Sequence, residues 1–247
     1  KKANTKKAVP LTMEKVRHLA RRSASAGFDD PLLAEQWNLI NEGNLRPTKF
    51  VKDADVQVEK AWKELNCAGD PSIIVAVLDE GVDVSHPDLK GSLWVNEGEI
   101  YGSHEDNDGN GYAGDLHGYN FVMSTGQIAV DSKYDTGHGS HVAGVIAAVN
   151  NNGIGVAGVA GGDKKNGTKG VGLLSCQIFQ PNPNDPSKDL GGDGASAIKW
   201  GADNGAVISQ NSWGYTYETD AEQAAATIPG HLKAAIDYFI ANAGMDA

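Results

Sequence analysis

The sequence predicts an α/β fold, a parallel β-sheet with helices on both faces. The first observation is a continuous apolar, β-branched run at residues 73–78, typical of a strand buried on both faces. The second is the alternation of this run and two further strand-like runs, 173–179 and 206–211, with helical patterns. Strands that alternate with helices favour a parallel sheet with right-handed crossovers. Chemically active groups are then expected at the carboxyl ends of the strands.

The first 27 residues are expected to form a segment of their own. Residues 12–22 read as a short helix, and the Ser-Ala-Ser-Ala-Gly stretch at 23–27 as a flexible joint. We place a boundary there, which leaves 28–247 as one large domain. The first 22 residues hold eight basic side chains and one acid, and we interpret them as a solvated linker or helix.

Four helices are expected beyond this boundary. The first spans residues 55–65, with Asp55 as its cap, and the second is a run of small residues at 141–149. In the last, apolar side chains recur at i, i+3, i+4, i+7 and i+8. The positions that share an apolar face are Val58, Ala61, Trp62 and Leu65 in the first helix, Ala195, Ile198 and Ala202 in the third, and Leu232, Ala235, Ile236, Phe239 and Ile240 in the last.

Charge and composition exclude several classes of protein. Beyond residue 22 the chain carries 13 basic and 31 acidic residues, which repels phosphate backbones and makes nucleic acid an unfavourable partner, but which can attract calcium. No apolar run approaches the roughly 20 residues of a membrane span, and no signal peptide is visible. Cys67 and Cys176 fit buried thiols or a single bridge equally well.

Two segments carry the chemistry. Asp79 directly follows the first predicted strand, and His138 stands between two glycines at the start of the second predicted helix. Small residues after the histidine, Val142 to Gly144, allow this helix to pack tightly against the sheet. A carboxylate and an imidazole suit a site in which the imidazole activates a hydroxyl nucleophile and the carboxylate orients the imidazole.

Four segments resemble the subtilase family, the subtilisin-like serine peptidases. Residues 74–89, which end in His-Pro-Asp-Leu, look like the catalytic-aspartate segment, and residues 138–144 look like the catalytic-histidine segment. Residues 209–214 resemble the strand that lines the substrate cleft. Residues 30–37 are similar to the start of the mature domain in thermitase-like members. The resemblance covers 28–247, and it makes 1–27 the tail of a pro-segment or a linker.

This resemblance implies a serine endopeptidase, in which His138 is general base and then general acid, and Asp79 is its orienting group. The family's serine lies in a Gly-Thr-Ser-x-Ala segment, and these 247 residues contain no such segment. Asn242 lies within a helical pattern and does not match the family's oxyanion asparagine. We therefore expect this chain, taken alone, to be inactive. Glu80 replaces the family's usual Ser or Thr, which leaves the local hydrogen bond to Asp79 in question.

The resemblance also implies two walls of a substrate cleft. The stretch 191–194, with Gly192, resembles the edge strand against which extended peptides pair. Ser212, Trp213 and Gly214 would form the opposite wall. A turn at a helix entry explains the glycines equally well, and Trp213 could equally be a core residue.

A polar loop after the first strand predicts one calcium site. Oxygen-bearing residues alternate there, with a glycine at the sixth position, as in loops that wrap one calcium ion. The acid expected at the twelfth position is missing, because that residue is His117. The alternative is a glycine-rich polar turn. The expected ligands are Asp106, Asp108, Asn110, the carbonyl of Tyr112, and Asp115.

A second calcium site is implied by the resemblance alone. The stretch 149–156 looks like the family's calcium-binding loop at the end of the histidine helix. Such an ion would tie the start of the mature domain to the core. A plain asparagine-rich helix exit is the alternative. The ligands carried over are the carboxylates of Asp30 and Asp88, the side chain of Asn152, and the carbonyls of Val149, Ile154 and Val156.

Three functions compete at this point. The first is the peptidase, with polypeptide substrates, its own pro-segment as a further partner, and an extracytoplasmic or secreted location by family analogy. The second is a catalytically inactive homologue that binds peptides. The third is a metal-dependent hydrolase using Asp79, His86, His138 and His141, which the lack of a His-Glu-x-x-His pattern disfavours. We also expect one exposed sheet edge and self-association.

Overall fold

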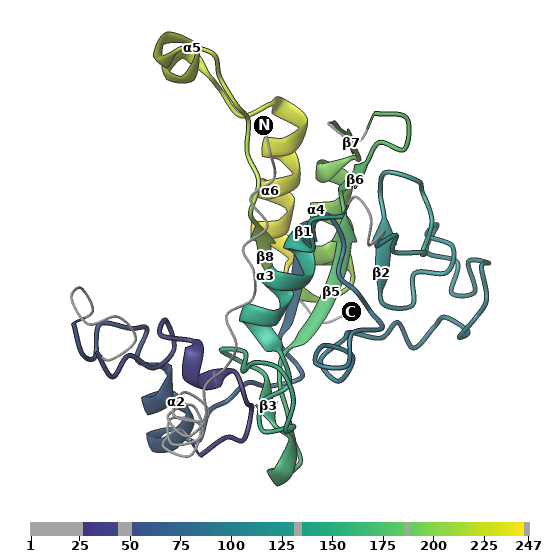
Figure 1. Ribbon diagram of the computed structural model, residues 1–247. Helices are drawn as coiled ribbons and strands as arrows, with labels where there is room; N and C mark the ends of the chain where they lie inside the picture. The colour runs from purple at the N-terminus through teal and green to yellow at the C-terminus, as the bar shows by residue number, and fades with distance from the viewer. Residues whose placement is uncertain (1–26, 44–50, 131–134, 186–187, 245–247) are drawn as a thin grey trace.

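A four-stranded parallel sheet forms the centre of the protein (Figure 1). The strand order is β2-β5-β1-β8, and every neighbouring pair is parallel. This confirms the predicted fold class. The strands are β1 (Ile74–Asp79), β2 (Gly118–Asn120), β5 (Gly172–Gln177) and β8 (Ala206–Asn211). The computed structural model describes residues 27–43, 51–130, 135–185 and 188–244, so the helix expected at 12–22 and most of the joint after it lie outside the described residues.

Helices cover both faces of the sheet. Successive side chains of a strand point to opposite faces, so Val75 and Val77 pack with α3, while Ala76 and Leu78 pack beneath α4 around Trp200. Since β1 is central and buried on both sides, its sequence is apolar at every position before Asp79. The covering helices are α3 (His138–Ala147) on one face, and α4 (Gly194–Asp203) and α6 (Gly230–Asn242) on the other.

A smaller core lies beside the sheet, toward the N-terminal part of the chain. Phe28 packs against Trp62 in a tilted arrangement with ring centroids 4.9 Å apart, and the Trp62 indole donates to the carbonyl of Val159. The prediction that Asp55 caps a helix there is wrong: Gln57 is the capping position, and the Asp55 carboxylate accepts bonds from the backbone of Gln57 and of Asn41. Leu65, at 75% exposure, is not on the buried face. The elements of this region are η1 (Leu33–Glu35) and α2 (Val58–Glu64).

The expected strand at 173–179 is two strands. The parallel ladder continues to Ile178, whose N–H donates to the carbonyl of Asp79, and Gly192 then donates to the carbonyl of Ile178. From there the chain pairs in an antiparallel hairpin rather than in the main sheet. The hairpin strands are β6 (Phe179–Pro181) and β7 (Asp189–Gly191). A second small hairpin joins β3 (Gly162–Asp163), η2 (Lys164–Asn166) and β4 (Thr168–Lys169).

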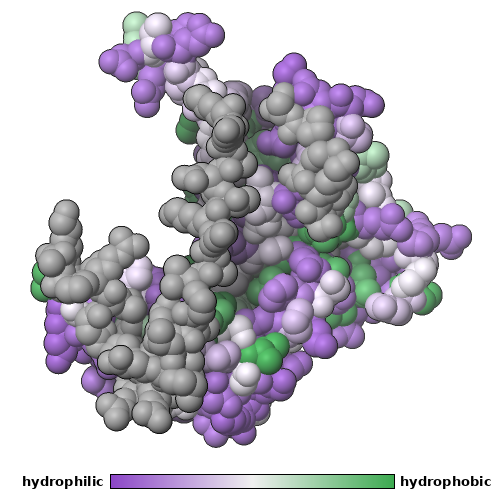
Figure 2. Space-filling model, in the orientation of Figure 1, coloured by the Kyte–Doolittle hydropathy of each residue, from purple (hydrophilic) through white to green (hydrophobic). Residues whose placement is uncertain are grey.

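The segment after β8 extends away from the body. It contains the short helix α5 (Asp220–Ala225), which buries none of its residues and projects from the rest of the molecule in Figure 1. Its surface is mostly hydrophilic in Figure 2. Thr219 and Glu222 form a reciprocal capping box, so local hydrogen bonds hold this helix in the absence of packing.

The two cysteines do not form a bridge. Cys176 lies in the core beneath α4, where burial raises the pKa of its thiol, and Cys67 is exposed. Among the helices that the structure describes, none combines the length and apolar character needed to cross a membrane.

Candidate active site

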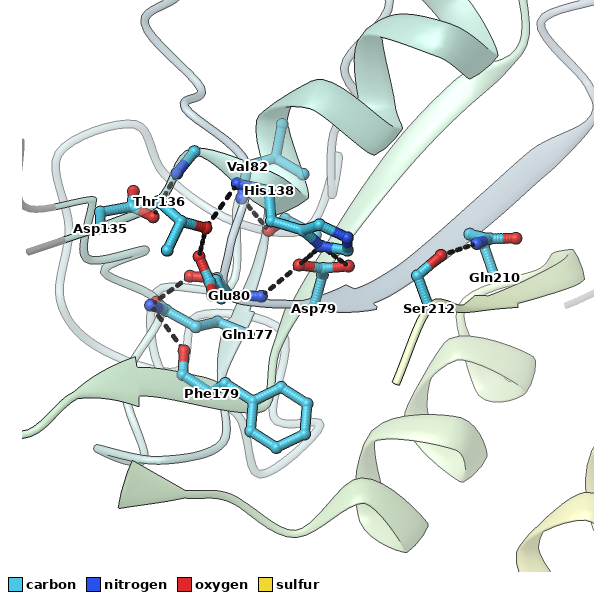
Figure 3. A network of polar contacts seen from close by, with 12 residues as sticks. Asp79, Glu80, Val82, Asp135, Thr136, His138, Gln177, Phe179, Gln210 and Ser212 are labelled. Carbon is cyan, nitrogen blue, oxygen red and sulfur yellow. Dashed lines mark hydrogen bonds and ion pairs between the residues drawn. The ribbon is translucent and has the colours of Figure 1, made fainter. Parts of the chain in front are cut away.

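Asp79 and His138 meet at the carboxyl end of β1 (Figure 3). The Nδ1 atom of His138 lies 2.8 Å from Oδ1 and 3.0 Å from Oδ2 of Asp79. The Asp79 side chain is 4% exposed and the imidazole is 48% exposed. The predicted juxtaposition, across 59 positions of sequence, is therefore confirmed. Because Nδ1 faces the carboxylate, the other ring nitrogen is directed away from it and is available to a reacting group.

Two glycines place the imidazole. Gly137 precedes α3 with φ 74°, a left-handed conformation that favours glycine. Gly139 lies so close to the turn after β1 that a Cβ there would be 2.2 Å from the carbonyl oxygen of Gly81. The start of α3 therefore packs directly on the backbone that follows Asp79, and His138 is held between the two glycines.

The sequence left open whether the residue at position 80 gives Asp79 a local hydrogen bond, and the backbone of Glu80 makes that bond. The N–H of Glu80 donates to Oδ1 of Asp79 at 2.8 Å, so no hydroxyl is needed at that position. The Glu80 carboxylate turns away and accepts from the hydroxyl of Thr136 at 2.7 Å. Burial, followed by the nearby carboxylate of Asp135, raises the pKa of Glu80.

The pair formed by Asp79 and His138, called the dyad below, favours a protonated imidazole. The hydrogen bond to Asp79 raises the pKa of His138, against a smaller opposing effect of burial. An imidazolium at this place is therefore stabilised, which is the electrostatic condition for a general base that must hold a proton during a reaction.

Gln177 is a positioning residue that the sequence interpretation missed. It ends β5, in register with Asp79 at the end of β1, and it is fully buried. Its amide nitrogen donates to the carbonyl of Glu80 at 2.7 Å (Figure 3). The same nitrogen donates to the carbonyl of Ala129 at 2.7 Å, and the amide oxygen accepts from the N–H of Ala129. The sequence feature that could have revealed Gln177 is a long polar side chain at the end of an apolar strand.

The residues predicted to line one wall of the cleft follow β8 directly. Ser212 accepts a hydrogen bond from the side chain of Gln210 at 2.6 Å, and the Trp213 indole donates to the side chain of Asn211 at 3.1 Å. The Trp213 ring lies 6.1 Å from that of Phe179, which joins the end of β8 to the β6 hairpin. Gly214 has no atom within 4 Å of where a Cβ would stand.

The opposite predicted wall is partly a strand and partly a helix entry. Strand β7 ends one residue before Gly192, where a Cβ would be 2.7 Å from the backbone of Phe121. Asp193 then caps α4 by accepting from the backbone N–H groups of Ala195 and Ser196. Of the two interpretations of this stretch, a turn at a helix entry therefore describes Asp193 and Gly194, and an edge strand describes β7.

The residues of the calcium site implied by the resemblance lie together. Asp30 is 0% exposed and accepts from the backbone N–H groups of Asn151 and Asn152. Asp88, at 3% exposed, accepts from the Asn152 amide at 2.7 Å and from the N–H of Val156 at 2.9 Å. Burial raises the pKa of Asp30 to about 6. Two buried carboxylates on the same asparagine-rich loop offer hard oxygen donors of the kind that a dication prefers.

The residues predicted to supply carbonyl ligands, Val149, Ile154 and Val156, lie in one loop. Val149 donates its N–H to the carbonyl of Asp88, and Ile154 donates to the side-chain oxygen of Asn152. Gly155 approaches so closely that a Cβ there would be 2.0 Å from the carboxylate of Asp88. The loop thus packs closely around Asp88.

The metal-hydrolase alternative has no support in this geometry. The Nδ1 atom of His86 accepts from the N–H of Asp88, outside the dyad, and His141 is exposed on α3. The group of acidic or imidazole side chains that the described residues bring within metal-binding distance lies elsewhere, at Glu99, Asp106 and Asp108.

A parallel α/β sheet with an Asp–His pair at the carboxyl end of its central strand defines the class of protein: it has the geometry that serine hydrolases use. The subtilase family model matches residues 70–246. The chain therefore belongs to the subtilase family.

Individual relatives agree with this assignment. The chain is 48% identical to subtilisin-like protease 1 of Plasmodium berghei over 86 residues, 34% of the chain and 14% of that protein. It is 31% identical to fervidolysin of Fervidobacterium pennivorans over 215 residues, 83% of the chain and 24% of that protein. The chain thus spans a quarter or less of these relatives. A solved structure of a Pseudoalteromonas arctica protease, 19% identical, shares the fold with a TM-score of 0.54 over 87% of the chain and 56% of that structure.

Proposed function

We propose that the protein is a serine endopeptidase that hydrolyses peptide bonds through an Asp–His–Ser triad. The observation that carries the proposal is the contact of 2.8 Å between Nδ1 of His138 and the buried carboxylate of Asp79. Membership of the subtilase family supports it. The nucleophile would be the serine of a Gly-Thr-Ser-x-Ala segment, which these 247 residues do not contain.

Each member of the dyad has a defined part in this chemistry. A serine hydroxyl becomes nucleophilic when an imidazole takes its proton, so the free ring nitrogen of His138 accepts that proton and later delivers it to the leaving amine. Asp79 fixes the tautomer by accepting from Nδ1, and it stabilises the imidazolium while the proton is held. The extended stretch after β8, with Ser212 to Gly214, and the β7 edge would bind the polypeptide on either side of the dyad.

Active-site labelling tests the proposal. A fluorophosphonate probe should label the protein when the family's serine segment is present, and should not label the 247-residue chain. His138→Ala should abolish labelling, and the matched control His141→Ala, an exposed histidine on the same helix, should leave it intact. Failure to label despite an intact serine segment would favour the peptide-binding homologue, whereas loss of labelling in both variants would show that the effect is not specific to the dyad.

We also propose that Asp30, Asp88 and the loop at 149–156 hold a structural calcium ion. The support is the burial of both carboxylates and their shared contact with Asn152. Because calcium binds the folded state and not the unfolded chain, it should raise the melting temperature. Asp88→Asn should reduce that rise in a thermal unfolding experiment, and an unchanged rise would contradict the proposal.

The extracytoplasmic location is proposed on the family resemblance alone. Calcium concentrations outside the cell suit a structural calcium site, which agrees with this location. Fractionation of the source cells, with an antibody raised against the chain, should place the protein outside the cytoplasm, and recovery in the cytoplasmic fraction would contradict the proposal.

A further inference from the structure

The residue that follows Asp79 is hydrogen-bonded to both members of the dyad, to one of them through a threonine (Figure 3). The backbone N–H of Glu80 donates to Oδ1 of Asp79 at 2.8 Å. The hydroxyl of Thr136 donates to Oε2 of Glu80 at 2.7 Å, and its oxygen accepts from the backbone N–H of His138 at 3.2 Å. One residue just beyond β1 is therefore joined directly to the carboxylate of the dyad, and through a single hydroxyl to the residue that carries the imidazole.

The hydroxyl of Thr136 supports the start of α3. The first backbone N–H groups of a helix have no partner within the helix, and a side-chain oxygen at the capping position commonly satisfies one of them. In α3 the capping position is Gly137, which has no side chain to offer. Thr136 accepts from the N–H of His138 instead, and Asp135 accepts from the N–H of Gly137 at 2.9 Å. The backbone of His138 is thus held by a side chain that precedes the helix.

The carboxylate of Glu80 determines the direction in which this hydroxyl points. A threonine hydroxyl has one proton to donate and accepts through its oxygen lone pairs, whereas an ionised carboxylate can only accept. The proton of Thr136 is therefore directed at Glu80, and the lone pairs remain for the N–H of His138. A hydrogen bond to a charged acceptor is also stronger than one between neutral groups. Without this acceptor, the hydroxyl could rotate and would no longer hold the backbone of His138 in one place.

Glu80 has a fixed backbone from which its side chain extends. Its N–H is bonded to Asp79, and its carbonyl accepts from the buried amide of Gln177 at 2.7 Å. The hydrogen bond to Asp79 is the main reason why the pKa of His138 is raised, and the charge of Glu80 contributes less to it than the charge of Asp79 does. The geometry therefore points to a role for Glu80 in placing His138 rather than in charging it.

We propose that Glu80 and Thr136 are positioning residues, which keep His138 in contact with Asp79 by tying the first residue of α3 to the end of β1. Each acts through the backbone of His138. The inference rests on the proposed peptidase function for its effect on catalysis, but its effect on the dyad itself requires no nucleophile. A Ser or Thr, the family's usual residue at position 80, has no carboxylate to offer the hydroxyl of Thr136.

An NMR titration of the His138 ring in the 247-residue chain tests the geometry. Thr136→Val removes the hydroxyl but keeps the shape of the side chain, so the contact with Asp79 should loosen and the pKa of His138 should fall toward about 6.5. Thr136→Ser retains a hydroxyl and should keep the midpoint of the parent. Ser85→Ala is the matched control, because it removes a hydroxyl that donates to Asp83 in the same loop, and it should titrate as the parent does. A midpoint unchanged by Thr136→Val would overturn the proposal.

Labelling kinetics test the effect on catalysis, in protein that contains the family's serine segment. Glu80→Ala should slow fluorophosphonate labelling by about tenfold or more, because a small displacement of a catalytic group is costly. It should lower kcat for a peptide substrate with little change in KM. Glu80→Gln keeps an oxygen that can accept from Thr136, and it should be labelled at close to the parent rate.

The two Glu80 variants separate position from charge. Equal losses in Glu80→Gln and Glu80→Ala would overturn the positioning role, because they would show that the charge of Glu80 acts instead. A parent protein that is not labelled would contradict the proposed peptidase function. The NMR titration would then still decide the positioning role, so the two proposals fail separately.

Discussion

At the residue scale, the site depends on a carboxylate that contacts one imidazole nitrogen through both of its oxygens. Asp79 is almost fully buried, and a backbone N–H from Glu80 directs one of the oxygens. The imidazole of His138 is half exposed, so the carboxylate is held rigidly while the proton carrier stays accessible. Hydrogen bonding to a buried charge is the dominant reason why the pKa of His138 is raised.

Asp79→Asn should lower the pKa of His138 toward its ordinary value of about 6.5. The amide retains the shape of the side chain but not the negative charge that favours the imidazolium. An NMR titration of the His138 ring measures this shift directly. Asp83→Asn, in the same loop but bonded to Ser85, is the control and should leave the titration midpoint in place. Identical midpoints in the parent and in Asp79→Asn would refute the assigned role.

The raised pKa of His138 in the parent protein also predicts a pH dependence of stability. Since the pKa of His138 is higher in the folded state, the protonated pair stabilises the fold fully below the unfolded value of about 6.5. That contribution disappears as the pH rises through the folded pKa. The free energy of unfolding of the parent, relative to Asp79→Asn, should therefore fall across this window in urea titrations, and a rise would contradict the assignment.

At the element scale, α3 is positioned by backbone contact rather than by side-chain packing at its first turn. Gly139→Ala should destabilise the fold by about 1–3 kcal/mol, because the added methyl group collides with the carbonyl of Gly81. Gly144→Ala in the same helix has no atom within 4 Å of the new methyl and should stabilise by about 0.5–1 kcal/mol. Urea unfolding measures both. Equal effects would show that helix propensity, and not close approach, decides the outcome.

The sequence predicted strands well where the chain holds an apolar, β-branched run. The run at 73–78 forms the buried strand β1, and the run at 206–211 forms β8 with the predicted limits although only Ala206 of it is buried. Prediction failed where hydrogen bonds decide. Asp55 bonds to the chain on both sides instead of capping α2, and the chain leaves the sheet after Ile178 to form the β6–β7 hairpin.

The same distinction holds for the candidate site. Asp79 and His138 were predictable because each stands at the end of a regular element. Gln177 was not, because its partners at 80 and 129 are loop carbonyls far away in sequence. Glu99 was not either, since only the folded loop brings it against Asp106.

At the scale of the whole molecule, the two edges of the sheet differ. At one edge, β2 is three residues long, and the bridge from Asn120 to Thr125 turns the chain back over it. At the other edge, β8 has six residues and pairs only with β1 among the described residues. Val207 and Ile208 are 37% and 49% exposed there. A long apolar edge with unpaired backbone groups is a template for pairing with another chain.

We therefore expect the 247-residue chain to self-associate through β8. Ile208→Lys should reduce association, because a charge on an edge strand opposes pairing with a second strand. Ile228→Lys is the matched control, since Ile228 is 58% exposed in the α5 segment and lies outside the sheet. Sedimentation velocity over a range of concentrations measures the outcome. A monodisperse parent would refute the expectation, and an equal effect of both substitutions would show that added charge, and not the β8 edge, controls association.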